Sequence, residues 1–242
     1  MPAGMLMQRI VVLNPKGGSG KTTIAINIAS YFALQGERPV LIDHDPQGSA
    51  TRWVKKRQSL QPLIHLISAY ERDARTTRAF QLRIPEGTGR VIIDTPAAVD
   101  AHDMPALIAG AEKILVPVLP SDIDIHACSR TIANLLLVAK VRRSDNRLGI
   151  VANRVKRHTR IYQSLTRFLG TLDIPIVATF RDSQCYIRSA ELGVGIHEMK
   201  PYLVQEDLEH WQSLLEWLAL PPGRPAQASV EAGAAITAGA VR

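Results

Sequence analysis

Short runs of aliphatic and β-branched residues recur along this 242-residue chain and alternate with longer segments of helical periodicity. A strand covered on both faces reads as a continuous apolar run, so these runs predict buried parallel strands. The predicted strands lie at 10–13, 39–42, 63–67 (an edge strand), 90–94, 113–118, 148–153 and 174–180, and the predicted helices at 24–34, 49–61, 71–83, 125–141, 159–170 and 203–220. The alternation predicts an α/β fold with a doubly wound, mostly parallel sheet and helices on both faces.

The two ends of the chain lack this pattern. Residues 1–7 precede the first strand and hold three methionines, so they predict a loose leader and leave the translation start open among Met1, Met5 and Met7. Residues 221–242 are Ala, Gly and Pro with few large apolar side chains, which predicts a disordered tail. The sequence therefore predicts a single domain over 8–220.

Composition narrows the class of protein. A hydrophobic content of 46% supports a real core, and the distant pair Cys128 and Cys185 indicates neither a disulfide framework nor a metal knuckle. No window has the length of a membrane span and the start lacks signal-peptide features, so we expect a cytoplasmic protein without a membrane partner. The net charge of +7 leaves a polyanion partner open.

A glycine-rich loop at 14–23 (NPKGGSGKTT) lies between the first strand and the first helix. Its glycines let successive backbone N–H groups point at one anion, and the helix adds its positive amino end. Lys21 is expected to reach the β- and γ-phosphates of a nucleotide, and Thr22 to offer its hydroxyl to Mg²⁺. The residues expected at the nucleotide are Lys16, Gly17, Gly18, Ser19, Gly20, Lys21, Thr22 and Thr23.

Carboxylates follow two of the predicted strands. Asp43 and Asp45 come after the strand at 39–42, and Asp94 ends the strand at 90–94. Ligands bind at the carboxyl ends of the strands in open α/β sheets, and an acid there suits a Mg²⁺-bound water. The sequence therefore predicts a nucleotide and Mg²⁺ as cofactors at these strand ends.

Three stretches carry a family resemblance. The loop has Pro15 where the usual motif has its first Gly, and the second lysine Lys16 makes it resemble the deviant Walker A motif of the ParA/MinD ATPases. The stretches 43–48 (DHDPQG) and 91–96 (VIIDTP) follow in the order and spacing of that family. One departure is Ala97, where ParA proteins often have a second Pro.

The resemblance covers roughly residues 7–220 and is closest to small ParA-type proteins without an N-terminal DNA-binding domain. It implies a P-loop ATPase of the deviant Walker A type, slow alone, which forms a homodimer on ATP binding and is stimulated by an adaptor. In this class the ATP dimer binds nonspecific nucleoid DNA, and the cycle segregates or spaces a cargo. Plasmid, chromosome and carboxysome all stay open as that cargo.

The resemblance also implies roles for single residues. Asp45 would orient the attacking water, although it could instead cap the helix that follows. Lys16 would cross to the partner's nucleotide, although it could be a solvated loop lysine. Asn153 would contact adenine, although a strand-end Asn is also a common turn former. The implied catalytic residues are Lys16, Lys21 and Asp45, and the implied Mg²⁺ residues are Thr22, Asp43 and Asp94.

Basic charge supports the DNA-binding class. Eight Lys or Arg residues against one acid lie between 140 and 160, and phosphate contacts of this kind give sequence-independent binding. The residues expected at DNA are Arg154, Lys156, Arg157, Arg160 and Arg188, with a solvated basic face as the alternative. The competing function, a MinD-like membrane-cycling ATPase, needs a basic amphipathic C-terminal helix, and the tail after Pro221 has only two arginines and no apolar face.

Overall fold

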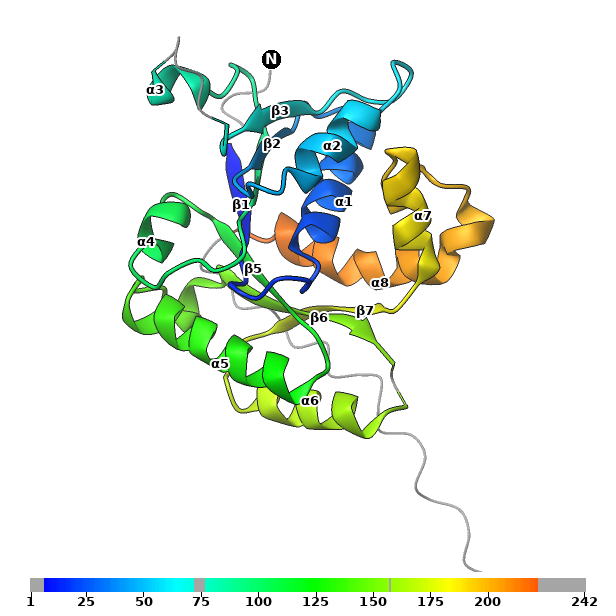
Figure 1. Ribbon diagram of the computed structural model, residues 1–242. Helices are drawn as coiled ribbons and strands as arrows, with labels where there is room; N and C mark the ends of the chain where they lie inside the picture. The colour runs from blue at the N-terminus through cyan, green and yellow to red at the C-terminus, as the bar shows by residue number, and fades with distance from the viewer. Residues whose placement is uncertain (1–6, 72–76, 157, 222–242) are drawn as a thin grey trace, which may run out of the picture.

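The computed structural model describes residues 7–71, 77–156 and 158–221, and it shows one sheet with helices on both sides (Figure 1). Seven parallel strands lie in the order β3-β2-β4-β1-β5-β6-β7. Their bounds are β1 Gln8–Val12, β2 Val40–Asp43, β3 His65–Ser68, β4 Arg90–Asp94, β5 Lys113–Val118, β6 Leu148–Val155 and β7 Ile176–Arg181. The predicted fold class is confirmed, with β3 at one edge.

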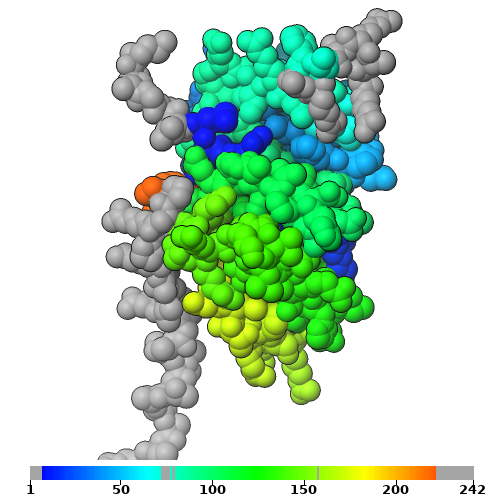
Figure 2. Space-filling model, turned by 90° about the vertical axis from the view of Figure 1, so that its left-hand side faces the viewer, coloured from blue at the N-terminus to red at the C-terminus, as the bar shows by residue number. Residues whose placement is uncertain are grey.

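Two helical layers cover the sheet. One layer holds α1 (Lys21–Leu34), α2 (Ser49–Lys56), α7 (Gln184–Leu192), the 3₁₀ turn η2 (Ile196–Glu198) and α8 (Pro201–Ala219). The other holds α4 (Met104–Leu107), α5 (Asp122–Leu137) and α6 (Arg160–Gly170), and Figure 2 views the molecule from the side of α4 and α5, in green. The short α3 (Arg78–Gln81) lies beside β3, and the 3₁₀ turn η1 (Arg143–Asp145) precedes β6. Because each layer buries its own apolar cluster against the sheet, the strands are covered on both faces.

Several predicted helix bounds were wrong. The helix expected over 49–61 ends at Lys56, because Arg57 turns to extended backbone and its guanidinium binds Glu198 at 2.7 and 2.8 Å. The helix expected at 125–141 begins at Asp122, where the Ser121 hydroxyl accepts the Asp124 N–H at 3.1 Å, and it ends at Leu137.

Some predicted segments lie partly or wholly outside the described residues. Of the helix expected at 71–83, only α3 at Arg78–Gln81 is helical among the described residues, and 72–76 lie outside them. Residues 1–6 of the expected leader and 222–242 of the expected tail also lie outside the described residues, so both remain predictions. Helix α7 was not predicted, although Ser183 caps its start and Gly193 ends it at φ +69°.

Candidate nucleotide site

The phosphate loop (residues 14–23) follows β1 and includes the first residues of α1, which begins at Lys21 and not at the predicted residue 24; it lies at the carboxyl ends of the central strands. Gly18 and Gly20 have φ values of +76° and +95°, which a side chain would strain. Behind the loop, the Asn153 side-chain amide donates to the Ser19 carbonyl at 2.8 Å, and a Cβ on Gly20 would clash with that amide. Asn153 thus supports the loop from the end of β6, while its expected contact with adenine stays a prediction.

Asn14 fastens the start of the loop to the sheet. Its side-chain amide donates to the Pro117 carbonyl on β5 at 2.6 Å, and its oxygen accepts the Lys16 N–H at 2.9 Å. Sequence reasoning assigned Asn14 no role, although a polar residue at the end of an apolar strand was a usable signal. With Asn14 at the start and Asn153 behind it, the loop is held from two neighbouring strands.

Two buried carboxylates face the loop. Asp43 on β2 and Asp94 on β4 are register partners on adjacent strands, and neither is exposed. The Thr22 hydroxyl donates to Asp94 Oδ2 at 2.7 Å. Burial raises the pKa of Asp94 to about 7, opposed by the hydrogen bond from Thr22. The structure therefore brings together the three residues that the resemblance implied for Mg²⁺.

The donor set fits a magnesium ion that carries nucleotide. Asp94 Oδ1 is buried and finds no hydrogen-bond partner within the described residues, so an oxygen is left for a cation. No group of three or more His, Cys, Asp or Glu side chains in the described ranges could hold a metal by itself. Mg²⁺ needs no such cage, because it keeps several waters and takes one or two protein oxygens together with phosphate.

The segment from Asp43 to Gly48 is organised by Asp43. Its Oδ2 accepts both the N–H and the hydroxyl of Thr51 at 2.8 Å, and its Oδ1 accepts the Asp45 N–H at 3.0 Å. Asp45 instead accepts the Gln47 N–H at 2.9 Å. The carboxylate that serves the amino end of α2 is therefore that of Asp43, and the structure gives Asp45 no capping bond to the helix.

The two lysines of the loop have different surroundings. Lys21 is buried and donates to the Lys16 carbonyl at 3.2 Å, and burial lowers its pKa while Asp94 and Asp45 oppose the shift. Lys16 forms an ion pair with Asp124 at 2.6 Å, and Asp124 is only 3% exposed. No role for Asp124 was predicted from the sequence. Lys16 is thus not merely solvated, because its ammonium is held by a buried acid.

The segment after β4 contacts the end of β1 and the phosphate loop. The Thr95 hydroxyl donates to the Val12 carbonyl at 2.9 Å, and the Ala98 N–H donates to the Pro15 carbonyl at 2.6 Å. Ala98 has a φ of +59°, which costs an Ala residue roughly 1 kcal/mol. Despite the Ala97 departure, this segment therefore bonds to the end of β1 through Thr95 and to the phosphate loop through Ala98.

The expected DNA residues do not share one face. Arg154 and Lys156 are exposed at the end of β6, and Arg160 is exposed at the start of α6, in one helical layer. Arg188 is exposed on α7, in the other layer, and Arg157 lies outside the described residues. Arg154 already pairs with Asp182 at 3.0 Å. The rest of the basic run precedes β6 and lies roughly 20 Å away, at about 3.3 Å per strand residue; it consists of Lys140, Arg142, Arg143 and Arg147.

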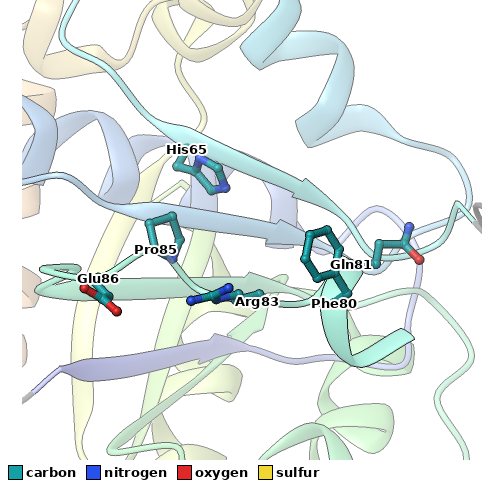
Figure 3. A pocket seen from close by; sticks show the side chains of 6 residues that line it. All are labelled: His65, Phe80, Gln81, Arg83, Pro85 and Glu86. Atoms are coloured by element: carbon teal, nitrogen blue, oxygen red, sulfur yellow. The ribbon is translucent and has the colours of Figure 1, made fainter. Parts of the chain in front are cut away.

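A surface pocket elsewhere on the molecule does not belong to this site. A pocket of about 460 Å³ lies beside β3 and is lined by His65, Phe80, Gln81, Arg83, Pro85 and Glu86 (Figure 3). His65 begins β3 and Gln81 donates to the Ser68 carbonyl at its end, so the pocket lies along this edge strand, which β2 and β4 separate from β1 and the phosphate loop. No helix in the described parts of the chain is both long and apolar enough to cross a bilayer.

A glycine-rich loop between a parallel strand and a helix, with a threonine hydroxyl on a strand-end carboxylate, defines the P-loop class of nucleotide-binding proteins. Comparison with protein families specifies the class further: the family model "CobQ/CobB/MinD/ParA nucleotide binding domain" matches residues 10–194. This match extends over most of the chain, which belongs to that family. The resemblance inferred from the sequence motifs is confirmed.

Curated relatives and a solved structure agree with the family. The chain is 33% identical over 136 residues to a maintenance of carboxysome distribution protein A from Gloeobacter kilaueensis, covering 56% of this chain and 60% of that protein. It is 27% identical over 197 residues to the protein of the same name from Halothiobacillus neapolitanus, covering 78% and 87%. The structure of a Cyanothece McdA variant in complex with ATP superposes with a TM-score of 0.68 at 18% identity, covering 93% of this chain and 100% of that one, which shows the shared fold.

Proposed function

We propose that this chain is a ParA-type positioning ATPase that hydrolyses ATP with Mg²⁺ as an ATP-dependent homodimer. The observation that carries the proposal is the bond from the Thr22 hydroxyl to Asp94, with Asp43 on the adjacent strand. It puts magnesium-binding oxygens directly beneath a phosphate loop. The relatives named for carboxysome distribution favour the positioning class over a membrane-cycling one.

Each residue of the site has a task in this proposal. Lys21 and the loop N–H groups bind the phosphates, and Thr22 and Asp94, supported by Asp43, hold the metal, which neutralises charge on the phosphates. Asp45 orients the attacking water. Its backbone is fixed to Asp43 while its side chain is only half-buried, so its carboxylate remains within reach of a ligand.

Lys16 supplies the second cation of the site from the opposite subunit. Phosphoryl transfer needs positive charge at the γ-phosphate, and a residue provided in trans can supply it. In the single chain the Lys16 ammonium is paired with Asp124 and its carbonyl accepts Lys21, so it does not serve its own phosphate loop as a free cation. Dimerisation would therefore complete the catalytic site.

The ATP dimer binds nonspecific DNA, and an adaptor protein stimulates hydrolysis and release. Two sets of phosphate contacts on one duplex raise the avidity by roughly 10² or more if the geometry permits. The expected contacts remain Arg154, Lys156, Arg157, Arg160 and Arg188. Repeated cycles in the cytoplasm would associate the protein with the nucleoid and space a cargo, with a carboxysome suggested by the names of the relatives and a plasmid or chromosome as the other candidates.

The test separates ATP binding from hydrolysis. Asp45→Ala should bind ATP normally and lose turnover, because Asp45 acts on water and the loop acts on phosphates, so the variant should accumulate as an ATP dimer. The matched control is Asp122→Ala, an exposed acid outside the site. Turnover and nucleotide retention are measured on the same samples, and normal turnover in Asp45→Ala would overturn the assignment.

A further inference from the structure

Helix α2 presents a basic face that the proposed site does not use. Arg52, Lys55 and Lys56 are exposed, while Ala50 and Trp53 are buried on the opposite side. Residues three and four apart lie on one side of a helix, so the three cations are neighbours. The sequence from 49 to 62 contains no acid, so the helix does not neutralise this face itself.

The nearby acid Glu198 is already paired, so it does not neutralise Lys55 or Lys56. Glu198 is taken by Arg57 through two hydrogen bonds, and both side chains of that pair are buried. Lys55 and Lys56 form no ion pair with any residue that the structure describes. Their charges are therefore available to a partner.

The same helix is bonded to the nucleotide site. Thr51 donates both its N–H and its hydroxyl to Asp43 Oδ2, and the hydroxyl also lies 3.2 Å from that of Ser68 on β3. Arg52 donates to the Gln47 carbonyl and to the Ser49 hydroxyl, at the end of the segment that carries Asp45. A shift of Asp43 when metal and nucleotide bind would move the first turn of α2 with it.

We propose that the basic face of α2 (Arg52, Lys55 and Lys56) contacts the phosphates of duplex DNA, and that the Thr51–Asp43 bonds link this contact to the nucleotide state. The inference rests on the proposed function and adds a DNA surface to the one expected around β6 and α6. By thermodynamic reciprocity, DNA that prefers the ATP-bound arrangement of α2 must also tighten ATP binding. Nucleotide thus controls DNA affinity within each subunit as well as through dimerisation.

The chemistry of the helix favours nucleic acid over a lipid surface. A helix that binds a bilayer inserts a free apolar face beneath its basic one. In α2 that face is used within the protein, since Trp53 is 3% exposed and packs in the core, where its indole N–H donates to the Val194 carbonyl at 3.3 Å. What remains outside is charge alone, which suits sequence-independent phosphate contact.

The experiment compares two double variants with equal charge loss. Lys55→Gln/Lys56→Gln removes the two unpaired cations of α2, and Lys140→Gln/Arg142→Gln removes two exposed cations that precede β6. Arg52 is left intact because it holds Gln47. Binding of a random-sequence duplex is followed by fluorescence anisotropy with ATP, ADP and no nucleotide across a salt series, and basal ATP turnover reports that each variant is folded.

We expect the α2 variant to bind DNA about tenfold more weakly in ATP and to lower the salt slope by about 1.8 per subunit, since each phosphate contact contributes about 0.9. The control pair should keep the wild-type slope. An unchanged slope in the α2 variant, or an equal loss in both variants, would overturn the inference while leaving the proposed function intact. Wild-type protein that binds no DNA in any nucleotide state would refute the DNA arm of the proposed function itself.

Two further measurements test the link between α2 and the nucleotide site, and the choice of DNA as the partner of the basic face. Thr51→Val keeps the basic face, so we expect an unchanged salt slope while the ratio of DNA affinities in ATP and ADP falls toward one. A ratio equal to that of the wild type would refute a link through the Thr51 hydroxyl, since Val keeps only the backbone N–H bond to Asp43. The last measurement uses phosphatidylglycerol vesicles. If the protein binds these vesicles through Lys55 and Lys56 and does not bind DNA, the basic face of α2 is a membrane-binding surface.

Discussion

Replacing Asp124 with Asn should make the ATP dimer tighter. In the single chain Asp124 holds the Lys16 ammonium at 2.6 Å, and the proposed function requires Lys16 to leave it for the partner's nucleotide. The Ser121 hydroxyl, which bonds both the side chain and the N–H of Asp124, can make the same contacts with an Asn side chain. The substitution therefore removes the charge that retains Lys16 and disturbs little else.

The size of the effect follows from the exposure of the pair. A fully buried pair broken on one side costs about 3–5 kcal/mol, but Lys16 is 32% exposed and can turn to water, so about 1 kcal/mol per subunit is the better figure. Two subunits release two pairs, about 2 kcal/mol in total. With about 1.36 kcal/mol for each factor of ten, the dimer should form about 30-fold more tightly.

Sedimentation equilibrium with a slowly hydrolysed ATP analogue measures the dimer constant directly. Asp122→Asn, at an exposed acid two residues away, is the matched control and should leave the constant unchanged. Lys16→Ala/Asp124→Asn should lose the gain, because no lysine is left to release. A folded Asp124→Asn protein whose dimer is no tighter than the wild type, or a gain that persists without Lys16, would refute the reasoning.

The remaining predictions concern the phosphate loop and one half-buried histidine. Lys21→Ala should lose nucleotide binding, whereas Lys16→Ala should keep much of it and lose ATP-dependent dimerisation; calorimetry and sedimentation distinguish them, and identical defects would contradict the assignment. Burial lowers the pKa of His197 from 6.5 to about 4, opposed by Glu198. For this side chain the folded state binds fewer protons than the unfolded state between pH 6.5 and 4, so its contribution to the free energy of unfolding should fall as pH drops through that window. The raised pKa of Asp94 acts in the opposite direction, so the test is the difference between the wild type and His197→Phe in a urea-unfolding series. The stability of the wild type relative to the variant should fall as pH drops, and a difference that stays constant with pH would exclude this role of His197.

The parts of the site that the sequence predicted depend on local pattern. The run of apolar residues before Asp94 marks a strand, and the position of the acid at its end follows from the direction of the chain. The glycines of the loop mark positions of positive φ, two of which the structure shows at Gly18 and Gly20. Because parallel strands present their carboxyl ends on one side of the sheet, the sequence placed Asp43 and Asp94 on the same side, whereas the pairing of β2 with β4 that makes them neighbours was seen only in the structure.

The parts that the sequence could not predict depend on contacts between distant segments. Asn153 meets Ser19 across 134 residues, and no local pattern indicates that pairing. The end of α2 is set by Arg57, whose partner Glu198 is 141 residues away. The basic run from 140 to 160 looked continuous, yet β6 separates it into one part at the amino end of the strand and one part at its carboxyl end.

The oligomeric state of the wild-type protein in different nucleotides tests the central claim most directly. Sedimentation velocity is run with Mg²⁺ and a slowly hydrolysed ATP analogue, with ADP, and without nucleotide. The account predicts a dimer with the ATP analogue and a monomer in the other two states, because Lys16 gains a phosphate partner only across an ATP-bound interface. The same mass in all three states would contradict it.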